Sequence, residues 1–340
     1  MTVKGPVLVT GSAGFIGFHT AQRLLARGET VIGVDNLNAY YDPALKQARL
    51  DLLLAQPGYI HHTLDLADRD GMAVMFARHS PRRIVHPGAQ AGIRYSVENP
   101  ETYVDSNVVG FLTVLEGARA IGAEHLVFAS TSSVFGANTA LPFSVRQGVA
   151  HPLNVYSATK IANEAMAHAY AYIFGMPCTG LRFFTVYGPW GRPDMALFKF
   201  TQAILEGRPI DVYGDGAMER DFTYVDDIVD GVVAALDDVP ARDPDWRADS
   251  PSPATSGVAP WRILNLGAGR REPLSRYIEV LEQALGHKAI LNIMPTQDGE
   301  MTRTEADVSE TRAALGYEPR TPIDVGVTRF VDWYRDFYRV

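Results

Sequence analysis

The feature that most constrains the fold is a glycine-rich turn near the N-terminus, in VLVTGSAGFIGFHTAQRLLARG (residues 7–28). A short apolar run leads into Gly11, Gly14 and Gly17, and an apolar pattern of helical period follows. Strand, tight turn and helix in this order are typical of a dinucleotide-binding unit, in which glycines let backbone N–H groups approach a pyrophosphate. The spacing G-x-x-G-x-x-G differs from the standard G-x-G-x-x-G, and a glycine turn without a ligand is the alternative.

An acidic residue follows the next apolar run, since TVIGVDNLN (residues 30–38) brings the chain to Asp35. A carboxylate at the end of this strand can accept hydrogen bonds from both ribose hydroxyls of NAD, and it would repel a 2′-phosphate. The sequence therefore predicts NAD, and not NADP, as the cofactor.

Further apolar runs continue the alternation of strands and helices. They are IHHTLDLAD (60–68), RRIVHPGAQAG (82–92), HLVFASTSSVFG (125–136) and CTGLRFFTVYG (178–188). Helical patterns separate most of them, which predicts an α/β fold with a doubly wound parallel sheet of the Rossmann type. Ligands bind beyond the carboxyl ends of such strands, so the glycine turn, the STSS segment and the TVYG segment should converge there.

A tyrosine and a lysine lie one helical turn apart in HPLNVYSATK (residues 151–160). Taken alone, Tyr156 and Lys160 are typical of a solvated polar face. Their place after the fifth predicted strand would instead put them beside the nicotinamide. A phenol has a pKa of about 10, and a nearby ammonium lowers it, so Tyr156 can act as a base. Thr131 and the serines beside it add hydroxyls, which predicts oxidation of an alcohol by hydride transfer.

These motifs together resemble an extended short-chain dehydrogenase/reductase, and more narrowly the UDP-glucuronate 4-epimerases. The resemblance covers nearly the whole chain. It is carried by DNLNAYYDPALKQARL (35–50), AQAGIRYSVENPETYVDSN (89–107), GLRFFTVYGPWGRPDMALFKF (180–200), RDFTYVDDIVDGV (220–232) and WRILNLG (261–267). It implies that Tyr156 takes the proton of the sugar 4-hydroxyl while NAD accepts hydride. The resulting 4-keto sugar is then reduced on its other face, with NAD retained and a homodimer formed.

The resemblance also implies a residue-level site in which Arg94 and Arg192 lie near the sugar or the diphosphate, and Arg220 contacts the diphosphate. The predicted catalytic residues are Tyr156, Lys160 and Thr131. The predicted NAD contacts are Gly11, Gly14, Phe15, Ile16, Gly17, Asp35, Asn36, Asp65, Leu66, Gln90, Tyr156, Lys160 and Phe183. The predicted UDP-sugar contacts are Arg94, Ser132, Ser133, Thr185, Arg192, Tyr213 and Arg220.

Glucuronate adds a chemical hazard, because a 4-ketone beside the C5 carboxylate is a β-keto acid that readily loses carbon dioxide. Hydroxyl donors that hold the carboxylate out of line with the carbonyl π system would slow this loss. By resemblance, nucleotide-sugar 4,6-dehydratases have Thr-Asp-Glu at this segment and UDP-glucuronate decarboxylases have Thr-Ser-Glu. Here the triplet is Thr131-Ser132-Ser133, which favours epimerisation. The alternative for the two serines is that they satisfy backbone groups in a loop.

Other activities are compatible with parts of the same pattern. A UDP-glucose/UDP-galactose 4-epimerase differs only in the group at C5 of the sugar, and a UDP-glucuronate decarboxylase differs in the fate of the same 4-keto intermediate. A net oxidoreductase would have to release reduced cofactor, and a non-catalytic NAD-bound regulator would not need Tyr156, Lys160 and Thr131 together.

Composition limits the partners and the compartment. The net charge of −8 and the lack of a dense basic run argue against nucleic acid as a partner. The single cysteine, Cys178, excludes an intrachain disulfide and reads as a buried thiol. No apolar run matches a signal peptide or approaches the ~20 residues of a membrane span. We expect a cytoplasmic enzyme with no membrane partner and no metal.

The coarser organisation is a sheet domain with a smaller C-terminal α/β lobe over the nucleotide-sugar. We assign residues 1–187 and 222–266 to the NAD-binding domain and residues 188–221 and 267–340 to the lobe, with 237–260 as an exposed loop.

Four residues near the predicted site call for separate interpretation. Arg182 and His86, at strand ends, are interpreted as structural. Pro87 and Gly88 depart from the resemblance, in which small or aliphatic residues are usual, and this could alter NAD affinity.

Overall fold

The computed structural model describes residues 5–214, 218–295 and 301–340. Its centre is a seven-stranded sheet in the order β11-β6-β5-β4-β1-β2-β3, and every neighbouring pair is parallel. The strands are β1 (Val7–Thr10), β2 (Val31–Asp35), β3 (Tyr59–Thr63), β4 (Arg83–His86), β5 (His125–Thr131), β6 (Cys178–Phe183) and β11 (Trp261–Leu266). This confirms the predicted doubly wound α/β fold.

Helices cover both faces of the sheet, because successive side chains of a strand point to opposite sides. Val7 and Val9 of β1 join one apolar cluster, whereas Leu8 between them joins the other. The helices are α1 (Phe15–Ala26), α2 (Pro43–Leu54), α3 (Arg69–His79), α6 (Gly110–Ile121), α7 (Val155–Phe174) and α9 (Val225–Asp237). Helix α1 packs against α9 and contributes to the Val7 cluster, and α3 packs against α6 in the Leu8 cluster.

The order of strands in the sheet reverses between β1 and β4. From β1 the chain adds β2 and β3 toward one edge of the sheet, and it then returns to add β4 on the other side of β1. A crevice opens at such a point beyond the carboxyl ends of the strands. Short helices follow β4 and β5 there: α4 (Ile93–Glu98), α5 (Pro100–Tyr103), the π-helix η1 (Val104–Val109) and the 3₁₀ helix η2 (Ser132–Phe135).

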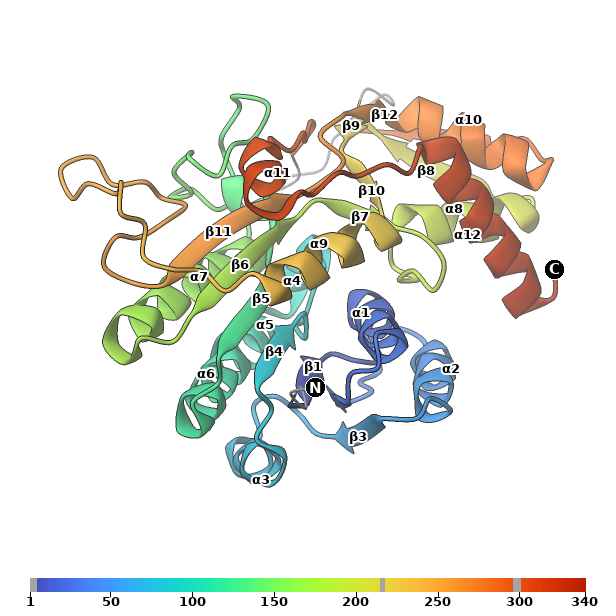
Figure 1. Cartoon of the computed structure of the whole chain (residues 1–340). Helices are drawn as coiled ribbons and strands as arrows, with labels where there is room; N and C mark the ends of the chain where they lie inside the picture. The colour runs from blue at the N-terminus through green and yellow to red at the C-terminus, as the bar shows by residue number, and fades with distance from the viewer. Residues whose placement is uncertain (1–4, 215–217, 296–300) are drawn as a thin grey trace.

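Most of the remaining elements lie at the upper right of Figure 1, beyond the sheet. They form three two-stranded pairings, β7 with β10, β8 with β13 and β9 with β12, and four helices. Their bounds are β7 (Thr185–Tyr187), α8 (Ala196–Leu205), β8 (Pro209–Tyr213), β9 (Glu219–Arg220), β10 (Phe222–Tyr224), β12 (Glu272–Pro273), α10 (Leu274–Leu285), β13 (Ile290–Met294), α11 (Ser309–Leu315) and α12 (Ile323–Tyr338).

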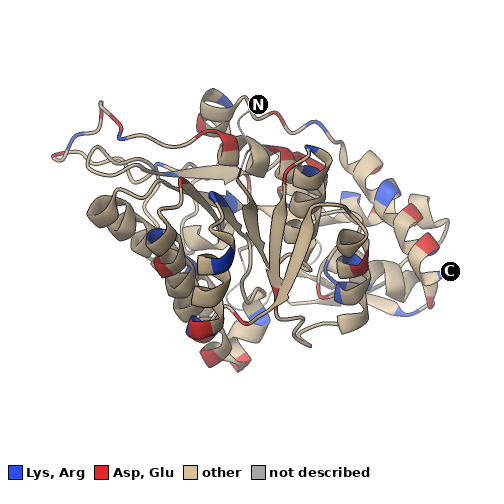
Figure 2. Cartoon of the chain, turned by 60° about the horizontal axis from the view of Figure 1, so that its bottom comes forward, with Lys and Arg blue, Asp and Glu red and all other residues tan. Residues whose placement is uncertain are grey.

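Residues 238–260, between α9 and β11, form no helix or ladder strand. Most of their side chains are exposed, but Ala254, Ser256 and Ala259 are buried and anchor the segment. Figure 2 shows acidic and basic positions interspersed over the helices. No helix within the described ranges has both the length and the apolar character that crossing a membrane would require.

Candidate active site

One cavity of about 900 Å³ opens where the carboxyl ends of the sheet strands face the C-terminal elements. Every residue of the predicted site lines it. These are Gly11, Gly14, Phe15, Ile16, Gly17, Asp35, Asn36, Asp65, Leu66, Gln90, Arg94, Thr131, Ser132, Ser133, Tyr156, Lys160, Phe183, Thr185, Arg192, Tyr213 and Arg220. Segments that are far apart in the sequence therefore line the same cavity.

The glycine turn at one end of the cavity leaves no room for side chains. Gly11 has a φ of +58°, and a Cβ at Gly17 would lie 2.1 Å from the Gly11 carbonyl oxygen. Within the described residues, no side chain caps the N-terminus of α1 at Gly14. The turn thus presents backbone N–H groups at a helix N-terminus, which fits a dinucleotide pyrophosphate.

Gly88, one of the two residues that depart from the family resemblance, packs against the glycine turn. A Cβ at Gly11 would lie 2.7 Å from the Gly88 Cα, and a Cβ at Gly88 would lie 2.8 Å from Thr10 Oγ1. The loop after β4 therefore packs backbone to backbone against the glycine turn. The buried His86 supports this contact, because its Nδ1 lies 2.7 Å from the same Thr10 hydroxyl.

Asp35 is held with its carboxylate at the cavity wall. One oxygen accepts a hydrogen bond from the Ala13 N–H at 3.0 Å, and the other accepts from the Leu37 N–H at 2.8 Å. Each oxygen keeps a second lone pair for a ribose hydroxyl. Farther out, Asn36 donates to Asp65 at 2.8 Å, which joins the ends of β2 and β3 at the predicted adenine side.

The catalytic candidates lie at the middle of the cavity. Lys160 is buried and donates from Nζ to the Ala129 carbonyl at 3.0 Å. Burial lowers the pKa of Lys160 to about 8. Desolvation raises the pKa of Tyr156, although a hydrogen bond with Thr131 and the charge of Arg192 oppose this rise.

The direction of the Tyr156 shift differs from the sequence-based expectation, which was that Lys160 would lower its pKa. In the structure the cost of desolvating a phenolate exceeds the opposing effects, so the net pKa of Tyr156 is above its ordinary value. The charge of the Arg192 guanidinium opposes the rise in the pKa of Tyr156, so Arg192 is close enough to act on this phenol.

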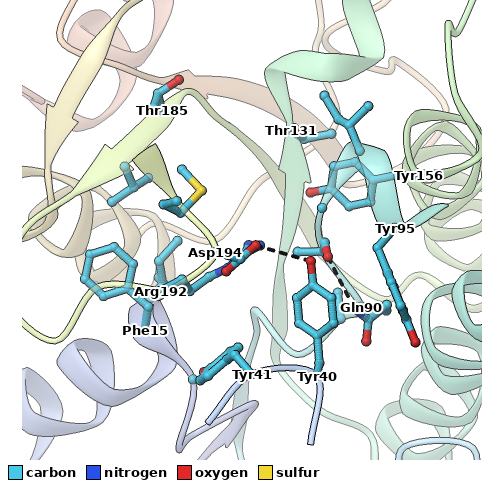
Figure 3. Close-up of a pocket in the computed structure, with 18 of the residues that line it drawn as sticks. Phe15, Tyr40, Tyr41, Gln90, Tyr95, Thr131, Tyr156, Thr185, Arg192 and Asp194 are labelled. Atoms are coloured by element: carbon cyan, nitrogen blue, oxygen red, sulfur yellow. Dashed lines mark hydrogen bonds and ion pairs between the residues drawn. The ribbon is translucent and has the colours of Figure 1, made fainter. Parts of the chain in front are cut away.

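Arg192 is joined to two neighbours that sequence reasoning missed. Its Nε donates to Asp194 at 3.0 Å, its Nη2 donates to the other Asp194 oxygen, and Tyr40 donates to Asp194 at 3.2 Å. Figure 3 shows Arg192, Asp194 and Tyr40 meeting in the pocket, with Tyr156 and Thr131 on its other side. Tyr40 and Asp194 stand in stretches that carried the family resemblance, which was the only signal available for them.

The hydroxyl residues of the STSS segment line the same cavity as Tyr156. Thr131 Oγ1 accepts the Ser133 N–H at 3.2 Å and so caps η2, whereas Ser132, Ser133 and Thr185 line the cavity. Thr131 therefore has both a local capping role and a hydrogen bond with Tyr156.

The far end of the cavity carries the other two predicted arginines. The Arg94 guanidinium lies 4.8 Å from the centre of the Tyr213 ring, and Arg220 donates to the Thr302 carbonyl at 2.9 Å. The buried Asp221 beside Arg220 accepts N–H groups of Ala268, Gly269 and Ala306, which fixes this strand against the chain that returns to it.

The chain belongs to the NAD dependent epimerase/dehydratase family, whose sequence profile matches residues 7–245. The prediction of NAD as the cofactor is confirmed at the level of the family.

Individual relatives match over almost the full length. The chain is 53% identical to an uncharacterised 37.6 kDa protein of Escherichia coli O111:H-, covering 98% of this chain and 99% of that protein. It is 46% identical to a probable UDP-glucuronate 4-epimerase of Rhizobium meliloti, covering 98% and 97%. Its fold resembles the crystal structure of a Bacillus cereus UDP-glucuronic acid 4-epimerase with UDP-glucuronic acid and NAD, with a TM-score of 0.87, 30% identity and coverage of 98% and 100%.

Proposed function

We propose that this protein interconverts UDP-glucuronate and UDP-galacturonate at C4 through a transient 4-keto sugar. The observation that carries the proposal is the single cavity in which the glycine turn and Asp35 adjoin Tyr156, Thr131 and Arg192. Relatives named as UDP-glucuronate 4-epimerases support it.

Bound NAD would supply a reversible hydride acceptor. The residues of the chain then handle the proton and the orientation of the sugar. Tyr156 takes the proton from the 4-hydroxyl and later returns it, with the Thr131 hydroxyl in the relay. We assign Lys160, whose ammonium donates to the Ala129 carbonyl, a place beside Tyr156 and the ribose, while the charge of Arg192 is the one that favours the phenolate of Tyr156.

Arg192 is the group best suited to the sugar carboxylate. A guanidinium binds a carboxylate by two parallel hydrogen bonds, and Arg192 is close enough to Tyr156 for its charge to act on the phenol. Ser132, Ser133 and Thr185 add hydroxyl donors that hold the carboxylate out of line with the C4 carbonyl. The STSS segment supplies no carboxylic acid that could catalyse dehydration.

Arg220, Arg94 and Tyr213 form the UDP end of the proposed site. Arg220 is suited to the diphosphate because phosphate oxygens accept from a guanidinium in the same two-pronged way. The Tyr213 ring, with Arg94 over it, offers a flat face of the kind on which a uracil stacks.

The assembly and the domain division belong to the same proposal. We assign residues 1–187 and 222–266 to NAD binding and 188–221 and 267–340 to the sugar nucleotide. We propose a homodimer through α7, whose exposed side is apolar at helical spacing, with Ala158, Ala165, Ala169, Tyr172 and Ile173. The single buried Cys178 suits a reducing compartment, and we propose the cytoplasm.

The test is proton NMR of the purified protein with UDP-glucuronate, first without added cofactor and then with NAD. We expect UDP-galacturonate to appear without net reduction of NAD, and turnover before NAD is added would indicate retained cofactor. A UDP-pentose as the main product would overturn the proposal in favour of a decarboxylase. An unchanged spectrum that responds instead to UDP-glucose would identify a neutral sugar as the substrate.

A further inference from the structure

Asp194 holds only one edge of the Arg192 guanidinium. It accepts from Nε at 3.0 Å and from Nη2, so that the pair is side-on and two-pronged. A guanidinium has five N–H donors in a rigid plane, and these two bonds use the Nε edge alone. The opposite edge, between Nη1 and Nη2, keeps the fork that pairs best with a second carboxylate.

Asp194 also accepts a hydrogen bond from a residue that is remote in the sequence. The Tyr40 hydroxyl donates to Asp194 Oδ2 at 3.2 Å, and Tyr40 belongs to the loop that follows Asp35. Desolvation, with the Asp194 charge, raises the pKa of Tyr40 to about 12, so the hydroxyl stays protonated and can donate. Arg192 overcomes the desolvation of Asp194 and holds the pKa of that carboxyl below its ordinary value.

The neighbouring backbone leaves a slot for the Tyr40 hydroxyl. Gly92 has a φ of +109°, and a Cβ there would lie 2.4 Å from the Tyr40 oxygen. The Tyr40 ring packs against Tyr95 at 4.9 Å, and Tyr95 leads through Tyr103 to the Tyr156 ring. The position of Tyr40 is thus tied by packed rings to that of the catalytic tyrosine.

We propose that Asp194, oriented by Tyr40, is a positioning residue that clamps one edge of Arg192 and turns the opposite edge toward the carboxylate of the sugar. The clamp has a chemical consequence for the reaction. In the 4-keto intermediate the C5–C6 bond breaks when it aligns with the C4 carbonyl. Its electron pair then passes into the enolate, carbon dioxide leaves and water supplies the proton at C5. A fixed Arg192 holds the carboxylate away from that alignment.

This inference rests on the proposed function, and its test compares Asp194→Asn with the unchanged protein. Asparagine keeps the size of the side chain but loses one of the two charge-assisted acceptors, so we expect KM for UDP-glucuronate to rise roughly tenfold. The ratio of UDP-pentose to UDP-galacturonate, measured by NMR, should also rise roughly tenfold or more. The Kd of UDP alone, measured by calorimetry, should stay within about twofold because Arg220 lies at the other end. Tyr40→Phe should change the same quantities in the same direction by a smaller factor.

The chain offers a matched control in Arg247 and Asp249, which form the same kind of Arg-x-Asp ion pair in an exposed loop. Asp249→Asn should leave KM and the product ratio unchanged. A rise in KM for UDP-glucuronate matched by an equal rise in the Kd of UDP, without UDP-pentose, would mean a purely structural role and would overturn the proposal. Tighter binding of UDP-glucuronate by Asp194→Asn would also overturn it, since Asp194 would then be a competitor for Arg192.

The ratio of the affinities for two UDP-sugars tests this inference independently of the proposed function. The affinity for UDP-glucuronate relative to UDP-glucose is measurable even if neither is turned over. A preference for the carboxylate that is lost in Asp194→Asn supports the clamp, whatever the reaction. No preference in the unchanged protein overturns the clamp, even if UDP-galacturonate is formed.

Discussion

Arg182 and Glu164 form a buried, two-pronged ion pair beside the candidate catalytic residues. Arg182 donates from Nε at 2.9 Å and from Nη2 at 2.8 Å, and Ser130 donates to the same carboxylate at 2.6 Å. Ser130 immediately precedes Thr131, and Glu164 lies one helical turn after Lys160. The pair therefore ties β5, β6 and α7 together, which supports the interpretation of Arg182 as structural.

Removing one partner of this pair should destabilise the protein strongly. Arg182→Met leaves the Glu164 carboxylate buried without its counter-charge, a change that typically costs about 3–5 kcal/mol. We expect a corresponding fall in the free energy of unfolding in urea. Arg247→Ala, which breaks an exposed pair, should change little. A loss for Arg182→Met no larger than that of Arg247→Ala would contradict the structural role.

Replacing the proposed base should stop turnover but leave the fold intact. Tyr156→Phe keeps the ring that packs edge-on against Tyr103 and removes the hydroxyl. We expect kcat for UDP-glucuronate to fall by roughly 10²–10⁴-fold, the usual worth of a general base, with the NAD content of the purified protein unchanged. Tyr338→Phe, at a half-exposed position of the C-terminal helix outside the cavity, is the control. Activity near that of the control in Tyr156→Phe would refute the assignment.

The glycine turn should tolerate no added methyl group at Gly17. A Cβ there would lie 2.1 Å from the Gly11 carbonyl oxygen, so α1 would have to move away from the turn. Overpacking of this kind costs about 1–3 kcal/mol, and we expect NAD affinity to fall roughly tenfold or more. NAD released from the denatured protein measures the retained amount. Gly148→Ala, where a Cβ meets open space, should retain NAD normally, and equal retention in Gly17→Ala would sink the prediction.

Two buried histidines should make the protein sensitive to mild acid. Burial lowers the pKa of His86 to about 3 and that of His125 to about 4. Between these values and the unfolded pKa of about 6.5, the unfolded chain binds protons that the folded chain does not, so stability falls as pH falls. Between pH 7 and pH 5 each histidine should remove roughly 2 kcal/mol of unfolding free energy.

The measurement is the free energy of unfolding as a function of pH. His125→Gln should flatten the slope, because one of the titrating groups is gone. His287→Gln changes an exposed histidine and serves as the control. A slope that is the same in His125→Gln and in the unchanged protein would show that His125 does not carry this effect.

Local sequence patterns were enough to predict the sheet, the cofactor end and the catalytic candidates. Strand and helix periodicity are local properties, and a parallel sheet brings every strand end to one edge. Gly11, Gly17, Asp35, Thr131 and Tyr156 follow or precede such strands in the chain, so their convergence could be predicted before any contact was known.

The support of the site and the ionisation of its groups depend on contacts that form only in the folded chain. The Arg192–Asp194–Tyr40 contacts and the close packing of Gly11 on Gly88 join segments that are remote in sequence, and no local pattern predicts them. The upward shift of the Tyr156 pKa likewise depends on desolvation by several segments at once. Such quantities are set by distances between side chains from different elements, which the fold creates and the order of residues does not specify.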